Sequence, residues 1–456
     1  MNTDLQREKT FISGRLRHSA QSSLWNGSAA KAVLTVIDQG VVSAANFLSL
    51  IIVGRACAQS ELGLYALGFT IVLFAMNSQN ALITSAYIVF SPRLSGEAHA
   101  RYTGSTLVHH VTLAVIIAAG LAVAGGLFAF MTAPTADLAG LDRVLWALAM
   151  VIFFILLKEY ARQVCFAGLR TGAALVLDLG MSALQVGGLT ALGVMGHLSA
   201  GRAYGVIGVA AAFAALTWLG TQRRRFAPVR SEVLPDFLRN WAYCRWIFAM
   251  NLAYVAANQA YPWVLVGFHG PVANGVFGAC AGVVFFANPF VLGLSNFLGP
   301  KAVHAYKEGG VPGMRSVVRK ATLFFAVTMT LFWLGMTLLG EWLLVLLFGP
   351  AYAGNGVTVS ILAASQLIWS LTIPVNFGLN AMERPDVAFK SLLLALAFTF
   401  TAGVWLVNAF GPAGVACGLL AGNGIACVYN RVVFARESRR RELMDPTDTG
   451  EGKDAL

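Results

Sequence analysis

The chain has 456 residues, of which 57% are hydrophobic and only 12% charged, with a mean hydropathy of +0.69 and a formal net charge of +11. A soluble globular protein carries roughly a quarter charged residues, so this composition excludes a soluble globule. The apolar residues gather in stretches of about twenty, the length that a helix needs to cross about 30 Å of hydrocarbon. We therefore predict an all-α, polytopic membrane protein.

Twelve apolar stretches follow one another along the chain, and each is predicted to be one membrane-spanning helix. They are 32–54, 63–91, 105–131, 144–166, 171–195, 203–220, 246–268, 272–298, 321–348, 356–381, 391–409 and 413–433. The predicted division of the chain is a cytoplasmic tail at 1–30, an N-lobe of spans one to six at 31–220, a polar cytoplasmic linker at 221–243, a C-lobe of spans seven to twelve at 244–435, and a cytoplasmic tail at 436–456.

The basic residues predict the orientation of these spans, because cytoplasmic loops of membrane proteins collect Lys and Arg. With the N-terminus inside, the cytoplasmic segments hold 29 of the 32 basic residues, and only Arg55, Arg143 and Arg202 fall outside them. The first thirty residues have no apolar core, so we expect no cleavable signal peptide. We predict a bacterial inner-membrane protein with both termini cytoplasmic, whose net charge reflects orientation in the lipid bilayer and requires no nucleic acid.

A weak internal repeat at about 210 residues predicts two related halves. Ala44-Ala45-Asn46 matches Ala256-Ala257-Asn258, and Pro92 matches Pro300. The offset covers six helices, an even number, so the two copies have the same orientation and are related by a pseudo-twofold axis along the membrane normal. Two six-helix lobes of this kind are typical of transporters.

Two acids lie within predicted spans, where an ionised side chain is costly and usually functional. Asp38 follows the start of span one beside Gln39, and Asp178 lies inside span five. Both are candidates for coupling transport to a proton or another cation, and Asp38 is the first choice. The alternative for each is a structural hydrogen bond between helices.

Amide and aromatic residues predict a surface that binds substrate. Asn251, Tyr254, Asn258 and Tyr261 recur at i, i+3, i+7 and i+10 in span seven, which places them on one stripe of a helix. Amides bond sugar hydroxyls and aromatic rings stack on sugar rings, although packing against a neighbouring helix explains the same pattern. The repeat and the shared helix faces add four further candidates: Asn46, Asn77, Asn80 and Asn288.

Cations that could meet a phosphorylated head group are found only near the ends of the spans. Arg55 lies at the outer end of span one, and Lys158, Arg162 and Arg245 lie near inner ends. The alternative is that these side chains extend to the membrane surface. Pro262, Pro289 and Pro374 are expected to bend spans seven, eight and ten.

The stretch 38–71, DQGVVSAANFLSLIIVGRACAQSELGLYALGFTI, resembles the opening of the Wzx-type polysaccharide-biosynthesis flippases, and LFGPAYAGNG at 347–356 resembles their link between the ninth and tenth spans. The resemblance implies the multidrug/oligosaccharidyl-lipid/polysaccharide exporter superfamily, with two six-helix lobes around a central cavity and alternating access. It implies a cavity lined by spans one, two, seven and eight. It also implies that the substrate is an undecaprenyl-diphosphate-linked oligosaccharide for exopolysaccharide or lipopolysaccharide assembly, with a polysaccharide polymerase and glycosyltransferases as possible partners.

Two other functions remain open. A cation-coupled multidrug or toxin extruder of the same superfamily is favoured by a lone acid in span one, and a non-transporting scaffold of a polysaccharide synthesis complex would tolerate loss of both acids. The sequence contains no GxxxxGK[ST] motif and no paired-carboxylate loop, so we expect neither an enzyme nor a cofactor. The six cysteines have no CxxC spacing, which favours core packing over metal binding.

Overall fold

The computed structural model describes residues 31, 33–131, 140–223 and 226–444. Within these residues, ten helices are long and apolar enough to cross a membrane, as expected for a multi-pass membrane protein. The predicted tail at 1–30, and the end of the other tail at 445–456, lie outside the described residues.

The first half of the chain forms helices that run back and forth. In chain order they are Val33–Ala56, α2 (Gln59–Gln79), α3 (Ser85–Phe90), α4 (Gly96–Met131), α5 (Leu141–Ala167), α6 (Thr171–Val194) and α7 (Ala200–Gln222). A π-helical turn at Asn80–Thr84 joins α2 to α3, and a 3₁₀ turn at Ser91–Arg93 ends this span.

The second half contains longer helices. They are α8 (Arg230–Phe285), α9 (Asn288–Phe348), α10 (Gly356–Ala381), α11 (Pro385–Phe398) and α12 (Val404–Met444), with a π-helical turn at Thr399–Gly403 between the last two. A 3₁₀ turn at Pro350–Tyr352 connects α9 to α10.

Glycines divide three of these long helical stretches into separate spans. Gly270, Gly310 and Gly411 have positive φ angles inside α8, α9 and α12. Glycine adopts this conformation without strain, and a proline one or two residues later fits the first turn of the next helix. Division at these points, with the turn at Phe286–Ala287 inside span eight, gives twelve segments in the predicted order. The prediction of about twelve spans is therefore confirmed.

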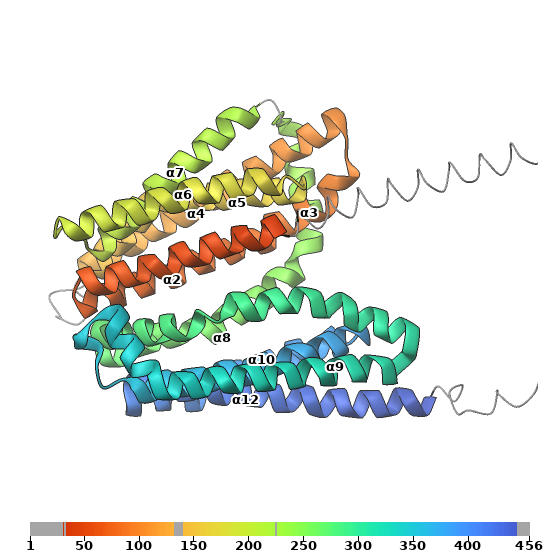
Figure 1. Ribbon diagram of the computed structural model, residues 1–456. Helices are drawn as coiled ribbons and strands as arrows, with labels where there is room; N and C mark the ends of the chain where they lie inside the picture. Colours follow the sequence, from red (N-terminus) through yellow and green to blue (C-terminus); the bar gives the residue numbers. More distant parts are fainter. Residues whose placement is uncertain (1–30, 32, 132–139, 224–225, 445–456) are drawn as a thin grey trace, which may run out of the picture.

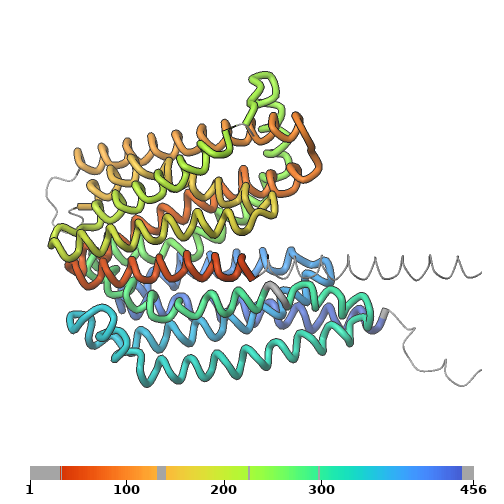
Figure 2. Tube along the Cα trace, turned by 45° about the horizontal axis from the view of Figure 1, so that its top comes forward, coloured from red at the N-terminus to blue at the C-terminus, as the bar shows by residue number. Residues whose placement is uncertain are grey.

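The helices pack as two lobes of six spans (Figure 1). The N-lobe contains the helices up to α7, with α5 packed on α4 and α7; the C-lobe contains α8 to α12, with α10 packed on α9 and α12. Both the start of the Val33–Ala56 helix and the end of α12 lie at the same end of the bundle (Figure 2). We call it the basic end, because Arg93, Arg170 and Arg384 lie in its turns; the far end holds the turns at 57–58, 195–199 and 349–355.

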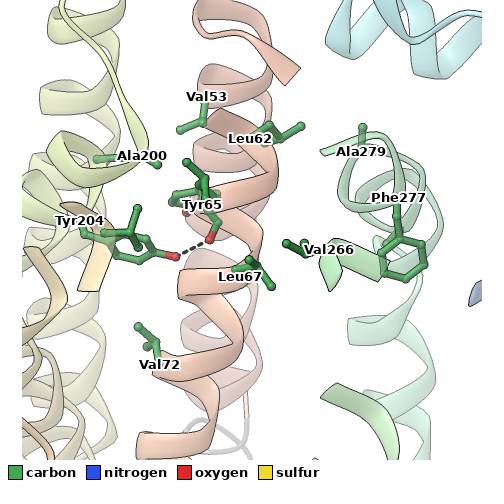
Figure 3. Close-up of a cluster of buried hydrophobic side chains, with 14 of the residues drawn as sticks. Val53, Leu62, Tyr65, Leu67, Val72, Ala200, Tyr204, Val266, Phe277 and Ala279 are labelled. Atoms are coloured by element: carbon green, nitrogen blue, oxygen red, sulfur yellow. Dashed lines mark hydrogen bonds between the residues drawn. The ribbon is translucent and has the colours of Figure 1, made fainter. Parts of the chain in front are cut away.

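The two lobes share a hydrophobic core only toward the far end. One buried cluster there joins Leu62 and Leu67 of α2 to Tyr204 of α7 and to Val266 and Phe277 of α8 (Figure 3). Toward the basic end the buried clusters are separate. One belongs to the N-lobe around Tyr87, Tyr160 and Trp218, and two others belong to the C-lobe. The lobes are therefore joined by a common core at one end of the bundle.

Close backbone contacts reinforce this joint at the far end. A Cβ atom on Gly63 would lie 1.8 Å from the carbonyl oxygen of Pro271, and one on Gly275 would lie 2.0 Å from that of Gln59. Asn274 Nδ2 donates a hydrogen bond of 2.8 Å to the Gly63 carbonyl. Only glycine allows the backbones of α2 and α8 to approach in this way.

We expect Gly63→Ala to push the lobes apart at the far end, because the added methyl group meets backbone that cannot rotate away. The readout is cross-linking of Gln59→Cys to Ala351→Cys in a background without the native cysteines, because the Gln59 side chain donates a 2.7 Å hydrogen bond to the Ala351 carbonyl across the lobes. Gly63→Ala should reduce the cross-linked fraction severalfold. Gly267→Ala is the matched control, since its Cβ atom would have nothing within 4 Å. Equal cross-linking in both variants would contradict the expectation.

The first part of α8 is attached to the N-lobe, although the rest of this helix belongs to the C-lobe. Glu232 pairs with Arg101 of α4 at 3.0 Å, and Asn240 Oδ1 accepts a 3.0 Å hydrogen bond from Tyr102 of α4. Much of the polar segment predicted as a linker at 221–243 is thus the continuous start of a helix. Of the three prolines that were expected to bend spans, Pro262 and Pro374 lie within helices. Pro289 lies in the first turn of α9, just after the turn at Phe286–Ala287.

Candidate functional site

A cluster of charged side chains lies buried where three helices of the N-lobe meet. Asp38 comes from the Val33–Ala56 helix, Lys158 and Arg162 from α5, and Asp178 from α6. The exposed fraction is 0% for both aspartate side chains, 8% for Lys158 and 12% for Arg162. The sequence predicts ion coupling for the two aspartates and head-group binding for the two cations, and the structure brings all four together.

Arg162 connects the two aspartates. Its Nη2 atom lies 2.9 Å from Asp38 Oδ2, and its Nε atom lies 2.7 Å from Asp178 Oδ2. Lys158 Nζ forms an ion pair with the other oxygen of Asp178. The planar guanidinium offers several donors in fixed directions, so one arginine can hold carboxylates from two helices at once.

Three further residues complete the cluster and were not predicted as site residues. Glu159 Oε1 lies 3.4 Å from Arg162 Nη1 and accepts a 2.7 Å hydrogen bond from Gln163. Gln39 accepts a 3.1 Å hydrogen bond from Arg162 Nη2. The available signal was the spacing along α5, where Lys158 and Arg162, and likewise Glu159 and Gln163, are four residues apart and so share a helix face.

The cluster contains more acidic than basic groups. Three carboxylates, from Asp38, Glu159 and Asp178, face two cations, from Lys158 and Arg162, so the cluster carries one net negative charge when all five groups are ionised. An unbalanced buried charge is costly. Asp38 Oδ1 is buried and has no hydrogen-bond partner among the described residues. One proton, or one monovalent cation, at this oxygen would balance the cluster.

In the interior of the C-lobe, neutral side chains form hydrogen bonds between helices. Gln366 Nε2 donates a 2.5 Å hydrogen bond to Asn288, and Asn430 donates one of 2.9 Å to Asn376. Asn423 donates one of 3.0 Å to Ser365. Asn288, predicted to line the cavity, is therefore held by a neighbouring helix of its own lobe.

The predicted stripe of α8 is divided between two surroundings. Asn251 and Asn258 are half-buried and Tyr254 is 48% exposed, with Asn258 Nδ2 bonded to the Tyr254 carbonyl at 2.9 Å. Tyr261 is only 2% exposed, and its hydroxyl lies where Cβ atoms on Gly403 and Gly418 would stand. Tyr261 thus packs inside the C-lobe and does not share a surface with the other three.

The predicted amides of the N-lobe are accessible to different degrees. Asn46 and Asn80 are exposed, and Asn77 is half-buried with its Nδ2 atom bonded to the Leu73 carbonyl at 2.8 Å. That bond uses the amide nitrogen, which leaves the amide oxygen as the acceptor for another group.

The remaining predicted cations, Arg55 and Arg245, lie apart from the charged cluster. Arg55 reaches across to the C-lobe at the far end, where its Nε atom donates to the Leu347 carbonyl at 2.9 Å and its Nη2 atom donates to the Leu346 carbonyl. A cation is favourable at the C-terminal end of a helix such as α9. Arg245 is exposed, with its guanidinium 5.8 Å from the ring centre of Trp246.

Comparison with known proteins identifies the fold. No family model and no curated protein matches the sequence. An inward-facing multidrug resistance MATE family transporter of the MOP superfamily aligns with a TM-score of 0.70 and 17% identity, over 88% of this chain and 96% of that one. The lipid II flippase MurJ in an inward closed conformation aligns with a TM-score of 0.70 and 12% identity, over 90% and 91%. An outward-facing MATE family transporter aligns with a TM-score of 0.52 and 15% identity, over 91% and 96%. The chain therefore has the two-lobed helical fold found in transporters of the MOP superfamily.

Proposed function

We propose that this protein is an alternating-access transporter that moves an undecaprenyl-diphosphate-linked oligosaccharide across the bacterial inner membrane for surface polysaccharide assembly. The observation that carries the proposal is the asymmetry between the two ends of the bundle. The lobes share one buried core at the far end, whereas their buried clusters are separate toward the basic end. A transporter of this kind opens to one side of the membrane at a time.

The basic residues supply the direction. By the positive-inside rule, we assign the basic end, where the Val33–Ala56 helix begins and α12 ends (Figure 2), to the cytoplasm. The structure then corresponds to a conformation closed toward the periplasm, and the greater similarity to inward-facing than to outward-facing neighbours agrees with this orientation. We therefore expect the substrate to enter from the cytoplasmic leaflet and to leave to the periplasmic leaflet.

Exposed and half-buried amides and an aromatic ring support a carbohydrate substrate. Asn46 and Asn80 of the N-lobe, with Asn251, Tyr254 and Asn258 of the C-lobe, offer hydrogen bonds to hydroxyl groups and a ring face for a sugar. The MurJ structure, described as a lipid II flippase, is a structural neighbour. A polysaccharide polymerase and glycosyltransferases are the partners that such a substrate implies.

A multidrug or toxin extruder is the second candidate, and one observation favours it. Lys158 and Arg162 are already paired with Asp38 and Asp178, so these cations are committed to acids rather than to a diphosphate. The charged cluster could then serve cation coupling alone.

Reconstitution into proteoliposomes separates the two candidates. A fluorescent undecaprenyl-diphosphate oligosaccharide in the outer leaflet, or a cationic dye in the lumen, is offered to the purified protein under a proton gradient. We expect gradient-dependent movement of the lipid-linked sugar and none of the dye. Dye movement alone would replace the flippase by the extruder. If neither substrate moves, the result would favour a non-transporting scaffold of a polysaccharide synthesis complex.

A further inference from the structure

A cavity with a partly polar lining lies inside the N-lobe at the basic end, and all of its lining residues belong to that lobe. Its volume is about 190 Å³, and thirteen residues from α3, α4, α5, α7 and the turns beside them line it. Because a water molecule takes about 30 Å³ of liquid volume, this space holds about six waters, or a phosphoryl group with the first atoms of its ester. The charged cluster of Asp38 and Arg162 is not part of this lining.

The polar groups of the cavity are one cation and several neutral side chains. Arg170 contributes a guanidinium, and its Nη1 atom donates at 3.0 Å to the neutral side chain of Gln222. His99 and Ser91 contribute a hydrogen-bonded pair at 3.0 Å. None of the thirteen described lining residues is acidic, so no carboxylate within the lining balances the guanidinium.

A buried donor in the same lining has no partner. Trp218 is only 7% exposed, and its indole Nε1 has no hydrogen-bond partner among the described residues. Its ring is fixed by edge-on contacts with Tyr160 and Phe226, with ring centres 6.5 Å and 5.7 Å apart. The Nε1 atom itself has almost no accessible surface, so the indole ring forms part of the cavity wall and its N–H group does not open into the space.

We propose that this cavity is a binding site for a phosphate-bearing ligand, with Arg170 as its principal donor. A phosphate group combines negative charge with several acceptor oxygens, which suits a guanidinium that faces no acid among the described lining residues. The aromatic and aliphatic side chains of Phe226, Tyr87 and Leu94 surround the remaining space and suit the organic part of a phosphate ester. The ligand is a lipid head group or a soluble phosphorylated compound, and its binding does not depend on the identity of the transported substrate.

Binding to the purified full-length protein in a neutral detergent tests the site. The probes are dioctanoyl phosphatidic acid, inorganic pyrophosphate and, as a phosphate-free control, dioctanoylglycerol, with stoichiometry and Kd measured by native mass spectrometry. We expect one saturable site for at least one phosphate probe and none for dioctanoylglycerol. Saturable binding of phosphatidic acid alone identifies a lipid head group, and binding of pyrophosphate identifies a soluble ligand.

Three variants separate this site from general attraction of anions. Arg170→Gln removes the guanidinium and should weaken binding about tenfold or more, because hydrogen bonds to charged groups are the strong ones. Trp218→Phe keeps an aromatic wall and removes an N–H group that does not open into the cavity, so it should leave Kd nearly unchanged. Arg93→Gln removes a charge from the same end outside the lining and should leave Kd unchanged. Equal weakening by Arg93→Gln and Arg170→Gln, or no saturable binding of either phosphate probe to the unaltered protein, would overturn the proposal.

Discussion

Asp38→Asn is expected to abolish transport while the protein still folds and reaches the membrane. Asparagine keeps the shape of the side chain and can still accept a hydrogen bond from Arg162, but it cannot exchange a proton or carry a charge. The substitution also removes one of the three carboxylates that face two cations, so the buried cluster becomes balanced in charge. A balanced cluster no longer changes its charge during the cycle, and the equilibrium between the two conformations loses its coupling.

Transport of the labelled lipid-linked sugar in proteoliposomes, with and without a proton gradient, measures this effect. The thermal unfolding temperature in detergent is the control for folding, and we expect it to remain the same or rise. Glu97→Gln is the matched variant, because this glutamate is 75% exposed and pairs with Arg101 outside the cluster. If Asp38→Asn transports at the rate of the unaltered protein, Asp38 is structural and proton coupling through it is wrong.

Arg162→Gln is expected to destabilise the protein strongly, and a second substitution is expected to rescue it. Loss of the guanidinium leaves three buried carboxylates against one cation, and removal of one partner from a buried ion pair typically costs about 3–5 kcal/mol. Adding Asp38→Asn removes one excess carboxylate, so the double variant should recover much of the lost stability. The effects of the two substitutions should therefore be far from additive.

Thermal unfolding of the four proteins in this cycle gives the coupling directly. Asp386→Asn in place of Asp38→Asn serves as the control, because Asp386 pairs with Arg384 and Lys390 at the basic end of the C-lobe. It should not rescue Arg162→Gln. Additive effects of Arg162→Gln and Asp38→Asn would show that the two side chains do not interact in the membrane.

The sequence predicted the number of spans and their order because both depend on local composition. A helix in lipid forms its backbone hydrogen bonds within itself and exposes apolar side chains to the lipid. Each span can therefore be recognised in the sequence as a run of apolar residues. The breaks within α8 and α12 were also visible, as Gly270-Pro271 and Gly411-Pro412. The turn at Phe286–Ala287 was harder to locate from the sequence. Pro289 indicates a break nearby, but the distance between the proline and the turn depends on packing.

The charged cluster was not predictable as a unit, because the contact that brings Asp38 into it joins residues more than a hundred positions apart. Arg162 and Asp38 are separated by 124 residues, and nothing in the hydropathy pattern pairs them. The α8 stripe shows a related limit. Spacing places Tyr254 and Tyr261 on one face of a helix, but a face of a long helix meets different neighbours along its length. Tyr261 meets the small residues Gly403 and Gly418, which admit its ring into the C-lobe.

The first part of α8 connects the two lobes, so we expect it to bend when they move against each other. Asn240 is hydrogen-bonded to the N-lobe, and Tyr261 is embedded in the C-lobe about 31 Å farther along the helix. In the proposed alternating-access cycle, we expect part of the movement between the lobes to bend the segment between these two residues. Asn251, Tyr254 and Asn258 lie on this segment. We therefore expect the distances between their polar groups to change between the conformations of the transport cycle. The affinity of these residues for a ligand and the arrangement of the two lobes would therefore both depend on the curvature of α8.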